Sequence, residues 1–446
     1  MYAELCSSCH GPTLAGGQAP SLLDDTWNFG GDDESIAQSI RDGRPSTAMP
    51  PFKAALSEQE IRALVIYIRE ERERAERDPT TAGARRGAPA PLPKGTLQSE
   101  RHAFKIELVA DGLDNPWGIA WLPDGRMLVT ERPGRLRIIE RDRLLVEPIA
   151  GVPPVWEEQD GGLMDVEAHP QFAANGWIYL SFSEEGRTPG TSATRIIRAR
   201  LRENRLVDQK TLFQPSPELY WEDNTHFGSR FLFDQRGHLF YSIGDRGHDG
   251  DAQELSSPYG KLHRVDDEGR PADGNPFADR PGALASIWSY GHRNQQGLAF
   301  HPITGDLWAA EHGPRGGDEL NRVERGRNYG WPTITYGMNY DGTPITDRTT
   351  QDGMEQPVVQ WTPSIAVCAI AFYTGDRFPR WRHDMFATAL AHQELRRIRI
   401  EGGTVVHQEV LFKGLGRVRD VATGPDGYLY VALNMPGRIV RLVPSQ

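Results

Sequence analysis

The sequence predicts a multidomain protein in which a small all-α domain is joined to an all-β, six-bladed β-propeller. Two observations carry this prediction: an apolar helical face near the N-terminus, and a strand–turn–strand motif that recurs six times after residue 104. The length of 446 residues favours more than one domain, and 47 glycines and 33 prolines suit a turn-rich β architecture. We assign 1–72 to the helical domain, 73–103 to a linker and 104–446 to the propeller.

Charge and composition narrow the range of partners. The net charge of −11 disfavours a nucleic-acid partner, which would select a basic surface. No segment approaches the roughly 20 apolar residues that a membrane-spanning helix needs. The three cysteines, Cys6, Cys9 and Cys368, do not provide a disulfide framework.

The helical domain is predicted to end in an amphipathic helix. Ser57 and Glu60 have the spacing of a capping box, which marks the start of a helix. Apolar residues then follow at positions i, i+3, i+4 and i+7: Ile61, Leu64, Val65 and Ile68. This face is expected to pack onto the core of the domain. In the linker, charged residues, Ala, Gly and Pro without periodicity predict an extended segment.

The segment Cys6-Ser7-Ser8-Cys9-His10 has the C-x-x-C-H pattern by which c-type haem is attached. Two thioether bonds and an axial imidazole would hold the haem, and the Met49 thioether is the candidate sixth ligand of the iron. Alone, the motif is also compatible with a zinc ligand pair, and a lone methionine is usually a core residue. The motif, Met49 and the closing helix, in this order, resemble a class I cytochrome c.

The haem motif also bears on the compartment. Because c-type haem is normally attached outside the bacterial cytoplasm, we expect a periplasmic protein. The printed sequence has no export signal ahead of Cys6, and we expect that such a segment was cleaved or omitted.

Six copies of the repeat support a closed propeller. Each copy has an apolar strand, a turn rich in Pro, Asp and Gly, and a second apolar strand. The copies span 117–131, 163–182, 229–245, 296–312, 366–390 and 418–434. The segments 133–136 and 436–439, after the first and last copies, are also alike, which favours a ring of blades over a pair of β-sandwiches.

Polar clusters flank the repeated strands, at positions that converge on one mouth of a propeller channel. His226 precedes the third copy, Arg293 precedes the fourth, and Arg417 and Arg419 open the sixth. Three arginines at one mouth repel one another unless an anion lies between them, so they indicate a polyanionic ligand. Carbonyl groups of the Gly-Pro-Arg-Gly-Gly loop at 313–317 could ligate a hard cation such as Ca²⁺.

Five long segments of the propeller region carry a specific resemblance: SIWSYGHRNQQGLAF, EHGPRGGDELN, GRNYGWP, HFGSRFLFD and RVRDVATGPDGYLY. They resemble the soluble quinoprotein glucose/sorbosone dehydrogenase family, nearest to its aldose sugar dehydrogenases. The resemblance runs through nearly all of 105–444. It implies a six-bladed propeller that holds pyrroloquinoline quinone (PQQ) and Ca²⁺ at the channel mouth and oxidises the anomeric carbon of aldoses to lactones.

The resemblance implies a role for individual residues. His226 matches the general base, with Arg293 beside it. The positions that contact PQQ are Arg293, Asn294, Gln296, His312, Ser364, Arg417 and Arg419. Gly313 and Pro314 match the carbonyl ligands of the catalytic Ca²⁺, and Glu319 and Tyr329 match a second, structural Ca²⁺ site.

Two positions depart from the family pattern. Asp160 stands where relatives carry a substrate-side glutamine, and Gln159 could take that role only if the loop shifts. Ala391 replaces a lysine that helps to bind the quinone, and the neighbouring His392 could partly replace its charge.

We therefore expect an aldose dehydrogenase that uses PQQ, Ca²⁺ and haem c. A histidine suits proton abstraction near neutral pH, and a quinone polarised by Ca²⁺ suits hydride acceptance. The haem is expected to pass electrons to an external acceptor, a cytochrome or another component of a respiratory chain. Two alternatives remain open: a propeller that hydrolyses lactones with a calcium cage, and a non-catalytic propeller that binds sugar or partners.

Overall fold

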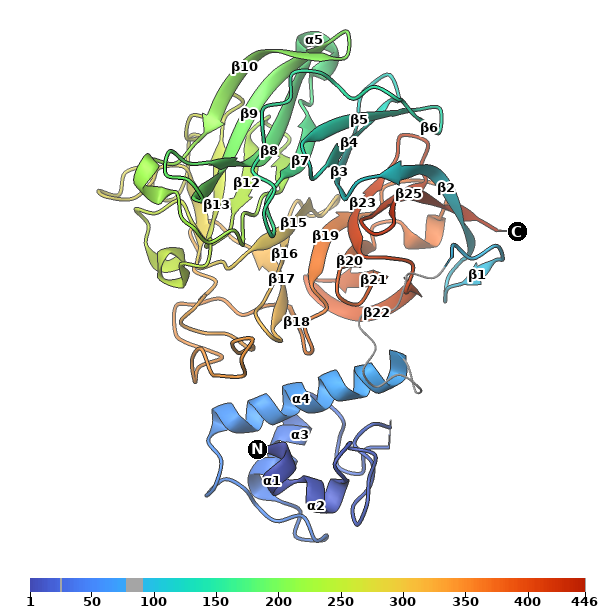
Figure 1. The fold of residues 1–446 in the computed structure, drawn as a ribbon, viewed down its shortest axis with the longest axis vertical. Helices are drawn as coiled ribbons and strands as arrows, with labels where there is room; N and C mark the ends of the chain where they lie inside the picture. The colour runs from blue at the N-terminus through green and yellow to red at the C-terminus, as the bar shows by residue number, and fades with distance from the viewer. Residues whose placement is uncertain (25, 78–90, 446) are drawn as a thin grey trace.

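A computed structural model describes residues 1–24, 26–77 and 91–445, and it has the predicted two-part architecture (Figure 1). A small helical domain lies against one face of a six-bladed β-propeller. Within the described residues, no helix is long and apolar enough to cross a membrane.

The helical domain is built around one long helix. Its elements are α1 (Tyr2–Leu5), α2 (Ser7–His10), α3 (Asp33–Asp42) and α4 (Glu58–Arg77). The predicted capping box forms at the start of α4: the backbone N–H of Ser57 donates to Oε2 of Glu60 at 2.8 Å, and the backbone N–H of Glu60 donates to Oγ of Ser57 at 3.3 Å. All four predicted apolar residues of α4 are buried in the core of this domain.

In the structure, ordered elements extend into both ends of the predicted linker, 73–103. Helix α4 continues to Arg77, beyond the expected boundary at residue 72, and strand β1 (Leu97–Gln98) begins ahead of residue 103. The remainder of the predicted linker lies largely outside the described residues, because 78–90 are not described.

Five blades are four-stranded antiparallel sheets formed by consecutive strands. Blade 1 contains β3 (Pro116–Trp121), β4 (Met127–Glu131), β5 (Arg135–Glu140) and β6 (Arg143–Leu144). Blade 2 contains β7 (Leu163–Ala168), β8 (Trp177–Glu185), β9 (Ser192–Arg202) and β10 (Arg205–Phe213). Blade 3 contains β11 (Phe231–Phe233), β12 (Leu239–Ile243), β13 (Lys261–Val265) and β14 (Ile287–Tyr290).

Blades 4 and 5 follow the same plan. Blade 4 contains β15 (Gln295–Phe300), β16 (Leu307–Glu311), β17 (Asp318–Val323) and β18 (Val359–Trp361). Blade 5 contains β19 (Val367–Phe372), β20 (Met385–Ala389), β21 (Glu394–Glu401) and β22 (Thr404–Lys413). Short helices lie in the connections: α5 (Phe172–Asn175), η1 (Pro217–Leu219), η2 (Asp249–Gln253) and η3 (Pro379–Trp381).

Blade 6 closes the ring with strands from both ends of the propeller. Strands β23 (Val418–Thr423), β24 (Leu429–Leu433) and β25 (Gly437–Pro444) come from the C-terminus, and β2 (Ala103–Leu113) pairs antiparallel with β25. The six repeats predicted from the sequence are the two inner strands of the six blades. Closure leaves few strand edges exposed.

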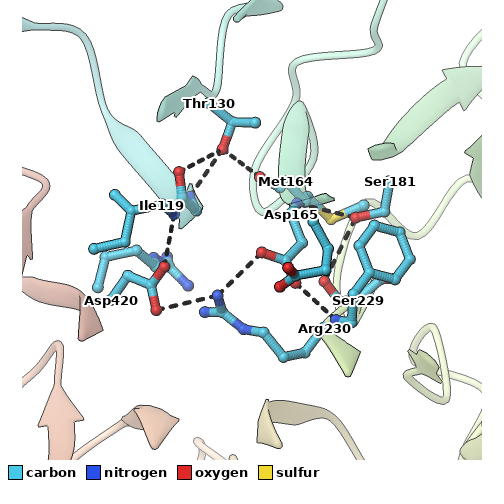
Figure 2. A network of polar contacts seen from close by, with 12 residues as sticks. Ile119, Thr130, Met164, Asp165, Ser181, Ser229, Arg230 and Asp420 are labelled. Carbon is cyan, nitrogen blue, oxygen red and sulfur yellow. Dashed lines mark hydrogen bonds and ion pairs between the residues drawn. The ribbon is translucent and has the colours of Figure 1, made fainter. Parts of the chain in front are cut away.

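Buried aspartates and one arginine join neighbouring blades near the channel axis (Figure 2). Asp165 of blade 2 accepts from the backbone N–H of Phe231 in blade 3 at 2.7 Å, and Asp420 of blade 6 accepts from that of Ile119 in blade 1 at 2.8 Å. Arg230 lies between the two carboxylates, 3.2 Å from each. Burial raises the pKa of Asp165 to about 6, against the opposing charge of Arg230.

The inner strands β3, β7, β11, β15, β19 and β23 pack against one another around the channel and start at the same mouth. In an antiparallel blade, the second strand ends where the first begins. Residues just before an inner strand, and residues just after the second strand of a blade, therefore meet at this mouth.

Candidate functional site

The helical domain presents the residues of the haem motif on α2 and on the segment before it. Nδ1 of His10 lies 3.1 Å from the carbonyl oxygen of Pro20, which fixes the ring and leaves Nε2 for an axial bond. Cys6 and Met49 both border the apolar core cluster of this domain. A haem bonded to Cys6 and Cys9 would therefore meet an apolar wall, and this donor set fits the group.

Gly43 brings Met49 close to the end of α3. Its φ is +65°, and a Cβ at this position would lie 2.6 Å from the carbonyl carbon of Pro50. The backbone N–H of Arg44 donates to the carbonyl oxygen of Met49 at 3.0 Å. Only glycine allows this close approach.

In the propeller, His226 is held by a buried carboxylate. Its Nδ1 lies 2.6 Å from Oδ1 of Asp245, and Oδ2 of Asp245 accepts from the indole N–H of Trp331 at 2.7 Å. His226 has a φ of +49° and lies just before β11, whereas Asp245 lies just after β12. Gly244 allows the backbone of His226 to approach, since a side chain there would collide with the His226 carbonyl. This arrangement fixes Nδ1 and leaves Nε2 as the ring atom that can accept a proton.

The surroundings of Asp245 favour its ionised form although the carboxyl group is buried. Burial by itself would raise the pKa of this carboxyl, but His226 and Arg293 outweigh that effect and lower it. The carboxylate is thus available to stabilise a protonated His226. The nearby Asp249 behaves in the opposite way: burial and the charge of Asp245 raise its pKa to about 6.

Arg293, Arg417 and Arg419 surround His312. Burial and the nearby cations lower the pKa of His312 well below its usual range, so the ring is neutral. Its Nε2 is buried and has no hydrogen-bond partner in the described part of the chain, and neither do the Nε atoms of Arg293 and Arg419. Such unsatisfied donors fit a buried anionic ligand that carries several acceptor oxygens.

Two hydrogen bonds connect the residues of blades 4 and 6 that are predicted to contact PQQ. Oε1 of Gln296 accepts from Arg419 at 3.1 Å, and Nε2 of Gln296 donates to Oδ1 of Asn294 at 3.1 Å. The guanidinium of Arg419 also lies over the ring of Trp117 and contacts Sγ of Cys368 at 3.4 Å. These contacts hold the side chains of Asn294, Gln296 and Arg419 in fixed positions at the mouth.

The loop that follows β16 contains both residues predicted for the catalytic Ca²⁺, Gly313 and Pro314. The carbonyl oxygen of Gly313 accepts from Arg293 at 2.9 Å, so a cation bound there would take the place of this contact. Asp318 accepts from the backbone N–H of Gly313 at 2.9 Å and from the hydroxyl of Ser364. Pro314 lines the same small cavity as Arg293 and His312.

The residues of the second predicted Ca²⁺ site line this cavity too. Glu319 and Tyr329 both border it, together with Glu311. Burial and the charge of Glu311 raise the pKa of Glu319 to about 8, and a cation would relieve both effects. The hydroxyl of Tyr329 is bound between the carbonyl of Arg322 and the N–H of Glu324, so Tyr329 has only its backbone carbonyl to offer.

Carboxylate clusters do not by themselves define a metal site in this protein. Among the residues that the structure describes, no group of three or more His, Cys, Asp or Glu side chains could hold a metal ion. Backbone carbonyls would therefore have to supply most of the ligands of a cation at the mouth.

Asp160, predicted as a substrate-side residue, lies beside His226 in the structure. Its Oδ2 accepts from the backbone N–H of His226 at 3.4 Å, and both Asp160 and Gln159 are exposed. His392 points elsewhere: its Nε2 contacts Glu73 of α4, in the helical domain. The His392 ring therefore contacts a carboxylate of the helical domain and not the cofactor residues at the mouth.

Comparison with known proteins gives the same assignment for this architecture. The family model of glucose/sorbosone dehydrogenases matches residues 113–441. The chain belongs to the glucose/sorbosone dehydrogenase family. A second model, the cbb3-type cytochrome c oxidase subunit III, matches residues 1–68, so the helical domain is a cytochrome c domain.

Relatives of this sugar dehydrogenase include proteins of known structure. Aldose sugar dehydrogenase YliI of Escherichia coli (strain K12) is 42% identical over 346 residues, which cover 76% of this chain and 92% of that protein. The apo-form structure of the soluble E. coli aldose sugar dehydrogenase has 41% identity and a TM-score of 0.72, and covers 77% of this chain and 100% of that chain. The PQQ-bound aldose sugar dehydrogenase of Streptomyces coelicolor has 28% identity and a TM-score of 0.64, and covers 77% of this chain and 98% of that chain.

Sequence reasoning missed two residues that hold His226 in place, Asp245 and Trp331. Asp245 ends the third repeat, in Ile243-Gly244-Asp245, and its position beside His226 could have been expected from strand order alone. Trp331 lies in a long connection of blade 4, and no local pattern relates it to His226.

Proposed function

We propose that this protein oxidises aldoses at the anomeric carbon to lactones, using PQQ and Ca²⁺ bound at the propeller mouth. The two electrons then pass singly to haem c in the N-terminal domain and from there to an external acceptor. We further propose that the protein works in the periplasm, where c-type haem is attached.

The His226–Asp245 pair is the observation that supports this function best. Oxidation of the C1 hydroxyl requires a base for its proton, and Nε2 of His226 is suited to this role because Asp245 fixes Nδ1. Asp160, which lies beside His226, is placed to orient a sugar hydroxyl. When bound, the quinone supplies the hydride acceptor and Ca²⁺ its polarisation.

The arginines would orient the cofactor. Arg293, Arg417 and Arg419 surround the mouth, and their charges match the carboxylates of PQQ. His312 stays neutral there and offers Nε2 for a hydrogen bond. Gly313, Pro314 and Glu319 are the residues that would hold Ca²⁺.

The overall reaction balances without oxygen. One aldose loses two electrons and two protons: the C1–H bond and the O–H bond break, and a carbonyl forms. A haem held by Cys6, Cys9 and His10 would take up one electron at a time, so each sugar would need two successive haem reductions, and the two protons would be released to solvent. The external acceptor then re-oxidises the haem.

Haem spectroscopy tests the proposal directly. Purified protein that carries haem is supplied with PQQ and Ca²⁺, a panel of aldoses is added, and haem reduction is followed in the visible spectrum. We expect rapid reduction with at least one aldose, and none without PQQ. Bound PQQ with no haem reduction by any aldose would instead favour the non-catalytic alternative.

The lactone hydrolase alternative has less support. It calls for a calcium cage of Asp, Glu or Asn side chains at the channel centre. There, the carboxylates of Asp165 and Asp420 are bridged by Arg230, whose guanidinium takes the position of a cation (Figure 2). The same preparation should therefore leave lactones intact.

A further inference from the structure

Two faces of helix α4 of the cytochrome domain make contacts, one within its own domain and one with the propeller. One face carries the apolar residues that pack into its own domain. The other carries Arg62, Ile66, Glu70 and Glu73, which follow one another at i, i+4, i+8 and i+11 and all contact the propeller. Figure 1 shows α4 lying between the rest of the cytochrome domain and the propeller. We call the second set the α4 docking face.

The first half of the α4 docking face contacts loops of blade 4. Arg62 donates to the backbone carbonyl of Thr335 at 3.2 Å, and Ile66 packs against Gly316. Glu70 forms a two-pronged ion pair with Arg315, with distances of 2.9 and 2.6 Å. A paired arginine–carboxylate contact of this kind fixes orientation as well as proximity.

The second half contacts blade 5. Glu73 pairs with His392, and Nζ of Lys413 lies 3.2 Å from Oε1 of Glu73. Glu394 lies on the far side of these two basic groups, 3.8 Å from Lys413. Glu73 of α4 thus joins His392, Lys413 and Glu394 in one cluster of acidic and basic side chains across the domain boundary.

These contacts lie at the same mouth as the cofactor residues. Arg315 is two residues from Gly313, whose carbonyl accepts from Arg293. His392 follows β20, the second strand of blade 5, and therefore lies at the mouth by the strand-order argument given above. The other side of the mouth, at Asp160 and His226, carries the proposed sugar-binding residues, and Asp160 is exposed.

We propose that the α4 docking face is the electron-transfer interface between the two domains, seated on the rim of blades 4 and 5, while sugar approaches from the side of Asp160. The inference rests on the proposed function and adds the route by which electrons leave the propeller. Helix α4, about 10 Å across, lies between the rest of the cytochrome domain and the propeller (Figure 1). Because both domains belong to one chain, transfer across this interface is intramolecular.

Zero-length cross-linking detects the contact between the two domains and requires no bound cofactor. A water-soluble carbodiimide joins a carboxylate to an amine in contact with it, so full-length protein should yield a Glu73–Lys413 amide, identified by mass spectrometry. Lys53 and Asp42, 3.3 Å apart within the cytochrome domain, provide an internal control. We expect the Glu73–Lys413 product to fall with increasing salt and to be lost in Glu70→Arg, with the Lys53–Asp42 product retained.

Kinetics then link docking to electron transfer. The Glu70→Arg variant should reduce a soluble artificial dye with aldose at the wild-type rate, because the propeller site is unaltered. Its haem should be reduced roughly tenfold more slowly. The double variant Glu70→Arg/Arg315→Glu restores the pair with reversed charges and should recover the cross-link. Glu34→Arg makes the same charge change on the exposed surface of α3 and should behave as wild type.

The possible outcomes distinguish a failure of the proposed function from a failure of the docking proposal. Wild-type protein that reduces neither dye nor haem with any aldose would overturn the proposed function. Wild-type protein that reduces both, together with a Glu70→Arg variant that loses the cross-link but keeps the wild-type rate of haem reduction, would overturn the docking proposal alone. A haem-reduction rate that rises with protein concentration would also overturn it, since transfer would then occur between molecules.

Discussion

Nδ1 of His226 lies 2.6 Å from Oδ1 of Asp245, and the indole of Trp331 holds the other oxygen of that carboxylate. The ring of His226 is therefore fixed by a buried carboxylate. In the proposed reaction, Asp245 is a positioning residue for His226.

Asp245→Asn should lower kcat for aldose oxidation by about 100-fold or more, because it removes the charge that orients and stabilises the His226 ring. His226→Gln should lower it at least as far. The measurement is dye reduction with PQQ-loaded protein across a range of pH, and loss of orientation should also change the pH profile. Asp223→Asn, in an exposed carboxylate that contacts His248, is the matched control and should retain activity. Full activity of Asp245→Asn would rule out this role.

Arg230→Met should destabilise the propeller by about 3–5 kcal/mol, because it leaves Asp165 and Asp420 buried without a cation. Denaturant unfolding of the full chain measures the change. Arg126→Met removes a partly exposed arginine paired with Asp124 at 2.8 Å and should cost less than about 1 kcal/mol. Equal losses in the two variants would mean that Arg230 does not brace the blades.

Gly43→Ala should displace Met49 and so weaken the iron ligation that we propose for its thioether. The backbone conformation at Gly43 costs a non-glycine residue of order 1–3 kcal/mol, and the new Cβ would lie 2.6 Å from Pro50. We expect a lower haem reduction potential and loss of the absorption band typical of methionine-ligated ferric haem. Gly95→Ala, where no atom lies within 4 Å of the new Cβ, should leave both unchanged.

Lys261 should make stability depend on alkaline pH. Its ammonium is buried and donates to the carbonyl oxygens of Asp251, Ala252 and Tyr259 at 2.7, 3.0 and 2.5 Å. Burial lowers its pKa from 10.5 to about 7, against the pull of Asp251, Glu254 and Asp245. Between these two pH values Lys261 is protonated in the unfolded chain but largely neutral in the folded protein. The contribution of Lys261 to the free energy of unfolding is therefore greatest above pH 10.5 and declines as the pH falls to about 7.

The test compares wild type with Lys261→Met in denaturant unfolding at pH 7 and pH 9.5. Wild type should gain stability relative to the variant by up to about 1.4 kcal/mol for each pH unit in this window. Lys210→Met, in an exposed side chain, should show no such gain. A pH-independent difference between wild type and Lys261→Met would contradict the prediction.

Local patterns in the sequence predicted much of this protein. The apolar face of α4 and the Ser57–Glu60 capping box depend on residues within two helical turns of each other, and both were confirmed. The six repeats predicted the inner strands of the six blades, because strand alternation and turn residues are also local. The C-x-x-C-H motif and Met49 predicted a haem domain in the same way.

Contacts between distant segments were decided only by the tertiary structure. Trp331 reaches Asp245 from a connection in another blade, and Glu73 of α4 reaches His392 and Lys413 across the domain boundary. No periodicity relates such residues, because they meet only when the blades close into a ring and the cytochrome domain packs on its rim. The sequence by itself therefore determined the two domains and the chemical groups they carry. The packing of blades and domains determined which carboxylate orients His226 and which side of the mouth faces the haem domain.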